Sequence, residues 1–115
     1  MNTCLVTGGA GYIGSHAVAE LNRRGFRTIV IDNLSEGHRE AVFDSPLEVV
    51  DLSDERELER VFDSYQIDGV MHFASLCYVG ESMTDPRKYF EQNLGNALTL
   101  LRVMLRHGVV NFILS

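Results

Sequence analysis

The sequence predicts an α/β fold, a doubly wound parallel sheet of about five strands in the order 3-2-1-4-5 with helices on both faces. Short apolar runs alternate along the 115 residues with longer segments whose apolar residues recur at helical spacing. Strands that alternate with helices pair in parallel, because each helix returns the chain to the same end of the sheet. Hydrophobic residues make up 45% and charged residues 23%, which is typical of one folded domain.

The first part of the chain predicts two strands joined by a helix. Residues 3–7 form an apolar run that ends in glycines, which indicates a buried strand. Residues 12–24 follow as a helix, and Gly25 lies where glycine commonly ends a helix. Residues 27–31 are β-branched and predict the second strand. Residues 33–45 are polar, so we expect a loop there with room for a helical turn.

A second helix and two further strands follow. Residues 47–50 predict the third strand. Ser53 is expected to cap the next helix, because serine is favoured there and acidic residues follow it at the positive end of the helix dipole. The apolar face of this helix comprises Leu58, Val61, Phe62 and Tyr65. Residues 69–74 predict the fourth strand.

The last part of the chain predicts a long helix and an edge strand. Residues 75–84 are expected to form a loop, and Asp85-Pro86 is typical of a helix start. The long helix runs over 87–107 and ends at Gly108. Its apolar stripe comprises Leu94, Ala97, Leu98, Leu101, Met104 and Leu105. Residues 109–114 predict the fifth strand, whose apolar edge is a hazard for self-association.

Composition argues against several classes of protein. A net charge of −6, with Lys88 as the single lysine, disfavours general binding to nucleic acid. No apolar run approaches the roughly 20 residues of a membrane helix, and the first residues lack the basic segment of a signal peptide. Cys4 and Cys77 do not form a metal-binding framework. We therefore expect reduced thiols, a cytoplasmic location, no membrane contact and no metal site.

The strongest chemical signal is the glycine-rich turn of residues 8–14, GGAGYIG. Gly9, Gly11 and Gly14 fit G-x-G-x-x-G, and a start at Gly8 gives the wider-spaced G-x-x-G-x-x-G. The turn follows a predicted strand and opens a predicted helix, which is the context of a dinucleotide-binding, Rossmann-like fold. The free N–H groups of the helix N-terminus suit phosphate. The competing interpretation is a glycine turn without a ligand.

Residues at the ends of the other strands extend this prediction. Asp32 ends the second strand, where an acid accepts hydrogen bonds from a ribose and repels a 2′-phosphate, which favours NAD over NADP. Asp51 ends the third strand and suits either an adenine contact or the capping of its own loop. His72, His16 and Cys4 are interpreted as core residues rather than catalytic groups.

Four segments of the sequence resemble the UDP-glucose 4-epimerases of the extended short-chain dehydrogenase/reductase family. They are VTGGAGYIGSH, VIDNLSEGHREAV, HFAS and VGES, and the resemblance extends along all 115 residues. It implies a tightly held NAD and a role in nucleotide-sugar and galactose metabolism. In this family, hydride leaves C4 of a UDP-hexose and returns to the opposite face of a 4-keto intermediate. The long helix packs against its mate in a homodimer.

The resemblance also implies a set of cofactor-binding residues. Those at the pyrophosphate are Gly8, Gly11, Tyr12, Ile13 and Gly14, and those at the adenosine ribose are Asp32, Asn33 and Ser35. Asp51 and Leu52 flank the adenine, and Phe73, Ala74 and Ser75 line the path to the nicotinamide ribose. The VGES segment, residues 79–82, lies near the sugar nucleotide.

The sequence departs from the family pattern in two ways. Cys77, Gln92 and Asn96 stand where the family usually has lysine, asparagine and glycine. No tyrosine is followed four residues later by lysine, whereas the family uses Tyr-x-x-x-Lys for catalysis. We therefore expect residues 1–115 to form an incomplete NAD-binding domain with no catalytic residue, no substrate domain and no activity alone. The alternative is a free-standing NAD(H)-binding or redox-sensing module, and a downstream reading frame with Tyr-x-x-x-Lys would argue against it.

Overall fold

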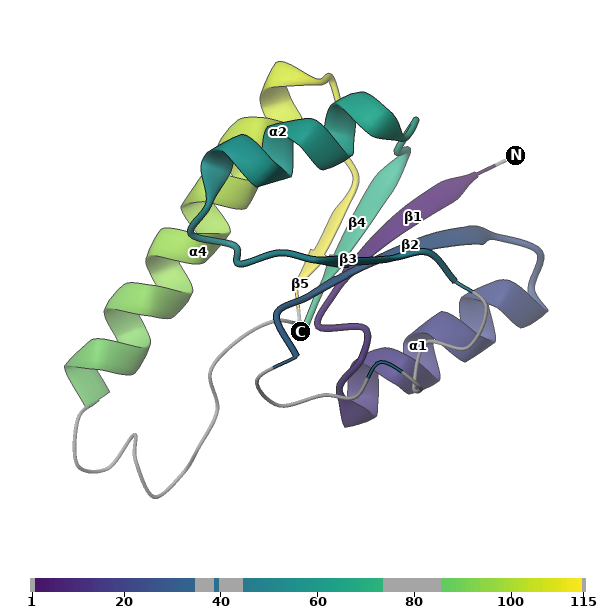
Figure 1. Ribbon diagram of the computed structural model, residues 1–115, viewed down its shortest axis with the longest axis horizontal. Coiled ribbons are helices and arrows are strands. Elements are labelled where there is room, and N and C mark those ends of the chain that lie inside the picture. Colours follow the sequence, from purple (N-terminus) through teal and green to yellow (C-terminus); the bar gives the residue numbers. More distant parts are fainter. Residues whose placement is uncertain (1, 35–38, 40–44, 74–85, 115) are drawn as a thin grey trace.

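The computed structural model describes residues 2–34, 39, 45–73 and 86–114 (Figure 1). Five strands form one parallel sheet in the order β3-β2-β1-β4-β5, which confirms the predicted topology. The strands are β1 (Thr3–Thr7), β2 (Arg27–Asp32), β3 (Leu47–Val49), β4 (Gly69–His72) and β5 (Phe112–Leu114). The helices are α1 (Tyr12–Arg23), α2 (Glu55–Ser64) and α4 (Pro86–Arg106).

Helices cover both faces of the sheet. In Figure 1, α2 and α4 lie side by side above the strands and α1 lies below them. Side chains alternate accordingly along β1, where Leu5 faces the α2 and α4 side and Val6 faces the α1 side. His72 and Cys4 are buried, as predicted, and burial raises the pKa of the Cys4 thiol. His16 is exposed, so its interpretation as a core residue was wrong.

Three strands are shorter than the sequence predicts, and β3 ends at Val49 instead of residue 50. Strand β4 ends at His72 instead of residue 74, although the Phe73 N–H still donates to the Thr7 carbonyl at 3.0 Å. Strand β5 begins at Phe112 instead of residue 109, because the residues before it complete the end of α4. Gly108 has φ +72° and the Val109 N–H donates to the Met104 carbonyl at 2.9 Å.

The cap of α2 also differs from the prediction. Asp54, not Ser53, is the N-cap, and its carboxylate accepts a hydrogen bond from the Glu57 N–H at 3.3 Å. Ser53 lies instead in the turn before the helix, where its N–H and hydroxyl both donate to Asp51, at 2.8 and 2.7 Å. Both residue types are good caps, so the choice depends on the turn that precedes the helix.

Helix α4 carries two apolar faces. One face is buried in the core through Leu100, Val103 and Met104. The other face is exposed to solvent along the helix at Phe90, Leu94, Leu98 and Leu105. A helix on a sheet needs only one apolar stripe, so the second stripe is available for another surface. None of the described helices is both long and apolar enough to span a bilayer.

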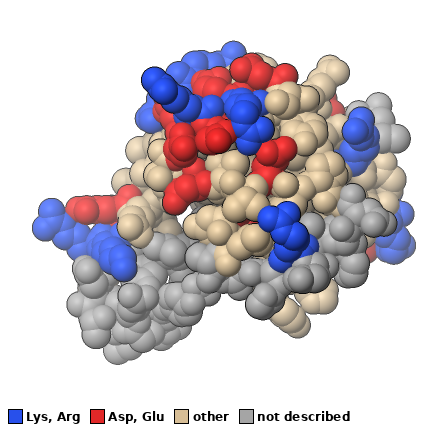
Figure 2. All heavy atoms as spheres, in the orientation of Figure 1, with Lys and Arg blue, Asp and Glu red and all other residues tan. Residues whose placement is uncertain are grey.

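Charged side chains join α2 to α4 across their outer surfaces. Figure 2 shows acidic and basic groups intermixed at the top of the molecule, over these two helices. Glu55 of α2 lies 2.8 Å from Arg102 and 3.1 Å from Arg106, both on α4. These two guanidinium groups hold the pKa of Glu55 below its usual range. The pairs are exposed, so each contributes little to stability.

Candidate functional site

The glycine-rich turn connects β1 to α1 and is anchored to β2. Gly8 has φ +71°, which is a left-handed conformation that favours glycine. Its N–H donates to the Ile31 carbonyl at 2.8 Å, and its carbonyl accepts from the Gly11 N–H at 3.1 Å. The turn is therefore tied to the neighbouring strand immediately before α1 begins.

Two glycines of the turn are required by the packing of the protein itself. A Cβ atom at Gly9 would lie 2.6 Å from Cγ1 of Val30 and 3.2 Å from Cγ2 of Val18, so the turn packs directly between α1 and β2. A Cβ atom at Gly14 would lie 2.1 Å from the carbonyl oxygen of Gly8. These contacts set the close approach of helix to strand that the glycine motif serves.

At position 11, by contrast, the packing of the protein does not require glycine. The φ of −80° at Gly11 is allowed for any residue, and a Cβ atom there would meet only the Gly8 carbonyl oxygen, at 3.4 Å. Gly11 is also the N-cap of α1, which has no side-chain cap and no acidic residue in its first turn. The helix thus presents free N–H groups and its positive end beside an open space. This arrangement fits the pyrophosphate of a dinucleotide.

Asp32 lies at the end of β2 and connects the turn to the next loop. Its side chain is buried, and its two oxygens accept hydrogen bonds from the Ala10 N–H at 3.0 Å and the Leu34 N–H at 2.7 Å. Each carboxylate oxygen can accept a second hydrogen bond, so ribose hydroxyls can still bind. Sequence spacing predicted the position of this acid, but the two backbone contacts were missed because they depend on the fold.

In the structure, the Asp51 side chain forms hydrogen bonds within its own loop. Its carboxylate accepts from the Ser53 N–H and hydroxyl, and these hydrogen bonds, that of the N–H first, lower the pKa of Asp51. Its carboxylate remains exposed, so the adenine contact stays a prediction. The Leu52 side chain is buried in the core between the sheet and α2, so only its backbone is available to a ligand.

The remaining predicted site residues fall into two groups. Tyr12 and Ile13 are 82% and 63% exposed in the first turn of α1, where large apolar side chains can cover a bound ligand. Asn33 is exposed after β2, and Phe73 packs against the core on the α1 side. Ser35, Ala74 and Ser75 lie outside the described residues, as does the VGES segment.

A buried polar pair supports the end of β4 beside the turn. The Thr7 hydroxyl lies 2.6 Å from Nδ1 of His72, and it also accepts from the Phe73 N–H at 3.1 Å. Burial lowers the pKa of His72, so the imidazole is neutral near pH 7. The pair fixes β1 against β4 where both strands reach the ligand edge of the sheet, which is a positioning role rather than a catalytic one.

Comparisons with known proteins agree with this geometry. The sequence pattern of the NAD dependent epimerase/dehydratase family matches residues 4–115. The UDP-glucose 4-epimerase of Rhizobium leguminosarum bv. trifolii is 43% identical over 113 residues, which are 98% of this chain and 35% of that protein. The UDP-glucose 4-epimerase of Halalkalibacterium halodurans is 45% identical over 111 residues, which are 96% of this chain and 33% of that protein.

Solved structures show the same similarity. The UDP-glucose 4-epimerase from Brucella ovis in complex with NAD has a TM-score of 0.94 and 39% identity over 99% of this chain and 35% of that chain. The enzyme from Bifidobacterium longum in complex with NAD⁺ and UDP has a TM-score of 0.92 and 38% identity, over 99% and 36% of the two chains. The chain thus spans about a third of the length of the relatives that it matches.

Proposed function

Because this chain belongs to the NAD dependent epimerase/dehydratase family, we propose that it is the NAD-binding portion of a UDP-glucose 4-epimerase. NAD is the cofactor of this family. The observation that carries the proposal is the uncapped N-terminus of α1, with open space at Gly11 and the Asp32 carboxylate beside it. A phosphate group and a ribose hydroxyl are the two chemical groups that such a pair recognises.

Each part of the proposed site has a separate task. The free backbone N–H groups of the first turn of α1, next to Gly11, would hold the pyrophosphate, and Asp32 would hold the adenosine ribose. Tyr12 and Ile13 would shield the bound phosphates from water, because they are the exposed apolar side chains of that turn. When bound, NAD supplies an acceptor for hydride from a sugar carbon, so the protein's task here is to bind and orient it.

The proposed substrate is a UDP-hexose. The structural relatives include the Bifidobacterium longum enzyme solved with UDP and the Thermotoga maritima enzyme solved with UDP-glucose. Residues 1–115 contain no tyrosine followed four residues later by lysine, so they carry no Tyr-x-x-x-Lys pair for acid and base chemistry. We therefore expect these residues alone to bind NAD without turning over sugar. A cytoplasmic location, which we also propose, suits the free Cys4 thiol.

Calorimetric titration with NAD⁺ tests this function. The chain should bind one NAD⁺, and Gly11→Val should weaken binding by roughly 10-fold or more, since overpacking typically costs about 1–3 kcal/mol. Gly95→Val is the matched control, because Gly95 lies on α4 with nothing within 4 Å of its Cβ position. Equal NAD⁺ affinity of a folded Gly11→Val variant and the parent chain would contradict the proposal. Conversion of UDP-galactose to UDP-glucose by the 115 residues alone would contradict the separate expectation that they do not turn over sugar.

We propose that the exposed stripe of α4 joins two copies of the chain. Phe90, Leu94 and Leu98 repeat every four residues and are 68%, 48% and 48% exposed. Light scattering should give a mass that rises with concentration toward a dimer. Leu98→Glu should raise the dissociation constant about 30-fold, the effect of a 2 kcal/mol hot spot. Val110→Glu, which changes an exposed valine outside α4, should not. A monomeric parent chain at every concentration would contradict this proposal.

A further inference from the structure

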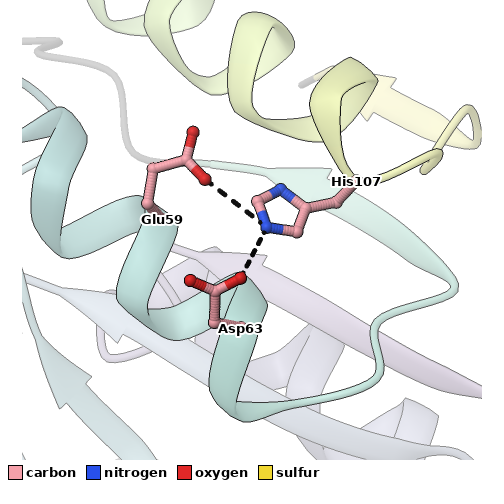
Figure 3. Close-up of side chains that lie close together, drawn as sticks. All are labelled: Glu59, Asp63 and His107. Atoms are coloured by element: carbon pink, nitrogen blue, oxygen red, sulfur yellow. Dashed lines mark hydrogen bonds and ion pairs between the residues drawn. The ribbon is translucent and has the colours of Figure 1, made fainter.

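Three side chains converge where α2 and α4 end (Figure 3). Glu59 and Asp63 lie one turn apart on α2, and His107 follows the last residue of α4. Nε2 of His107 lies 3.0 Å from Oδ1 of Asp63 and 3.4 Å from Oε2 of Glu59. From this geometry we propose that the three residues bind a divalent transition-metal ion such as Zn²⁺.

The spacing of the ligand atoms suits such an ion. A tetrahedral zinc ion with ligands at about 2.0–2.1 Å keeps neighbouring ligand atoms about 3.3 Å apart. The two nitrogen-to-oxygen distances of 3.0 and 3.4 Å bracket that value, and all three ligand atoms lie within 4.8 Å of one another. The Asp63 side chain is 72% exposed, so it can rotate to close the remaining gap. The open side leaves the fourth position to water.

The imidazole is oriented for metal binding before any ion arrives. Nδ1 of His107 lies 3.0 Å from the Val103 carbonyl, which can only accept, so Nδ1 carries a proton. Nε2 faces the Asp63 and Glu59 carboxylates, as a protonated donor when no metal is bound or as a lone pair directed at a metal. The ring packs against Phe62 with centroids 5.5 Å apart. A backbone carbonyl that fixes the second nitrogen of a histidine is the usual outer-shell support of a metal ligand.

The surrounding charge also favours a cation. Asp63 is the last residue but one of α2, which has no basic residue in its last turn, and α4 ends at the residue before His107. Both helices therefore direct their negative ends at the site. Arg106 is the nearby cation. It pairs with Oε1 of Glu59 at 2.8 Å and with Glu55 at 3.1 Å, which leaves Oε2 of Glu59 for the metal.

The three ligands favour some metal ions over others. A proton on Nε2 of His107 competes with any of these ions. An imidazole with two carboxylates suits Zn²⁺, Ni²⁺ or Cu²⁺ better than Mg²⁺ or Ca²⁺, which prefer oxygen alone. The competing proton on Nε2 would make the cluster an ion pair. The hydrogen bonds to Asp63 and Val103 raise the pKa of His107, so the imidazole keeps that proton to higher pH than a free histidine and the metal must displace it. A metal would tie α2 to α4, and its binding requires no NAD.

Zinc titration against a chromogenic chelator tests the site, in a Cys77→Ser background because a thiolate competes for zinc. The chain should take up one Zn²⁺ at pH 7.5. His107→Gln and Asp63→Asn should each weaken binding at least about 10-fold, because even outer-shell changes typically cost that much. His16→Gln is the matched control, since His16 is an exposed histidine on α1.

A second readout separates ligand loss from misfolding. Co²⁺ in place of Zn²⁺ should give visible absorption bands in the parent chain and in His16→Gln, and none in His107→Gln or Asp63→Asn. Circular dichroism should show that all four proteins are folded. No metal uptake by the parent chain, or equal uptake by a folded His107→Gln variant, would overturn the proposal and leave the cluster as an ion pair.

Discussion

Gly14→Ala is expected to destabilise the protein by at least about 3 kcal/mol, at or above the upper end of ordinary overpacking costs. The added Cβ would lie 2.1 Å from the Gly8 carbonyl oxygen, 2.8 Å from the Gly8 carbonyl carbon and 2.9 Å from Cα of Gly9. All three atoms belong to the backbone of the glycine turn, so no flexible side chain can move aside. Such a loss is a large share of the ~5–15 kcal/mol that stabilises a typical domain.

Gly95→Ala is the matched control for this substitution. Both glycines lie inside helices, but a Cβ at Gly95 has nothing within 4 Å, so alanine should stabilise α4 by about 0.5–1 kcal/mol. Urea unfolding followed by circular dichroism measures both variants. If Gly14→Ala unfolds within about 0.5 kcal/mol of the parent chain, which is the range of neutral surface changes, the close packing of the turn is contradicted.

Asp32→Ala is expected to have the second largest effect, and it combines two losses. Removal of the carboxylate leaves the Ala10 and Leu34 N–H groups without their acceptor, which should cost about 1–3 kcal/mol of folding free energy. It also removes the proposed ribose acceptor, and a hydrogen bond to a charged group is worth about 1.5–3 kcal/mol, so NAD⁺ should bind at least 10-fold more weakly.

Asp32→Asn separates the two losses. An asparagine keeps the shape but has one acceptor oxygen, so only one of the two backbone N–H groups can retain its partner. We expect a smaller loss of stability than for alanine, and a clear loss of NAD⁺ affinity. Calorimetry and urea unfolding measure both effects, with Glu91→Ala, an exposed acid of α4, as the control. A stable Asp32→Ala variant with the NAD⁺ affinity of the parent chain would remove Asp32 from the site.

The strand order and the apolar face of α2 could be predicted from the sequence because local patterns determine them, whereas Leu94, Leu98 and Leu105 of the stripe predicted for α4 are exposed. Apolar runs of strand length alternate with helical stripes, and glycine at 25 and 108 ends two helices with φ of +88° and +72°. The element ends were less predictable because they depend on neighbours. Ser53 and Asp54 are both suitable caps, and the sequence pattern did not show that Ser53 belongs to the preceding turn, where it donates to Asp51.

The candidate site, like the fold, was predictable from the sequence only in part. Spacing alone located the glycine turn and Asp32, but it could not distinguish Gly14, which the backbone requires, from Gly11, which it does not. The exposure of His16 was missed because the sequence pattern of an amphipathic helix does not show whether a single polar residue lies within its buried face or outside it. The cluster of Glu59, Asp63 and His107 has no sequence signature, since His107 and Asp63 are 44 residues apart.

The two backbone hydrogen bonds of Asp32 make separate loops into one cooperative unit. The Ala10 amide belongs to the turn before α1, and the Leu34 amide belongs to the connection after β2. Local opening of either segment weakens the support of the other, so the two amides should exchange their hydrogens with solvent at similar rates. A ligand held by Asp32 would slow both rates together, and amide exchange at Leu34 would then report on binding at the glycine turn.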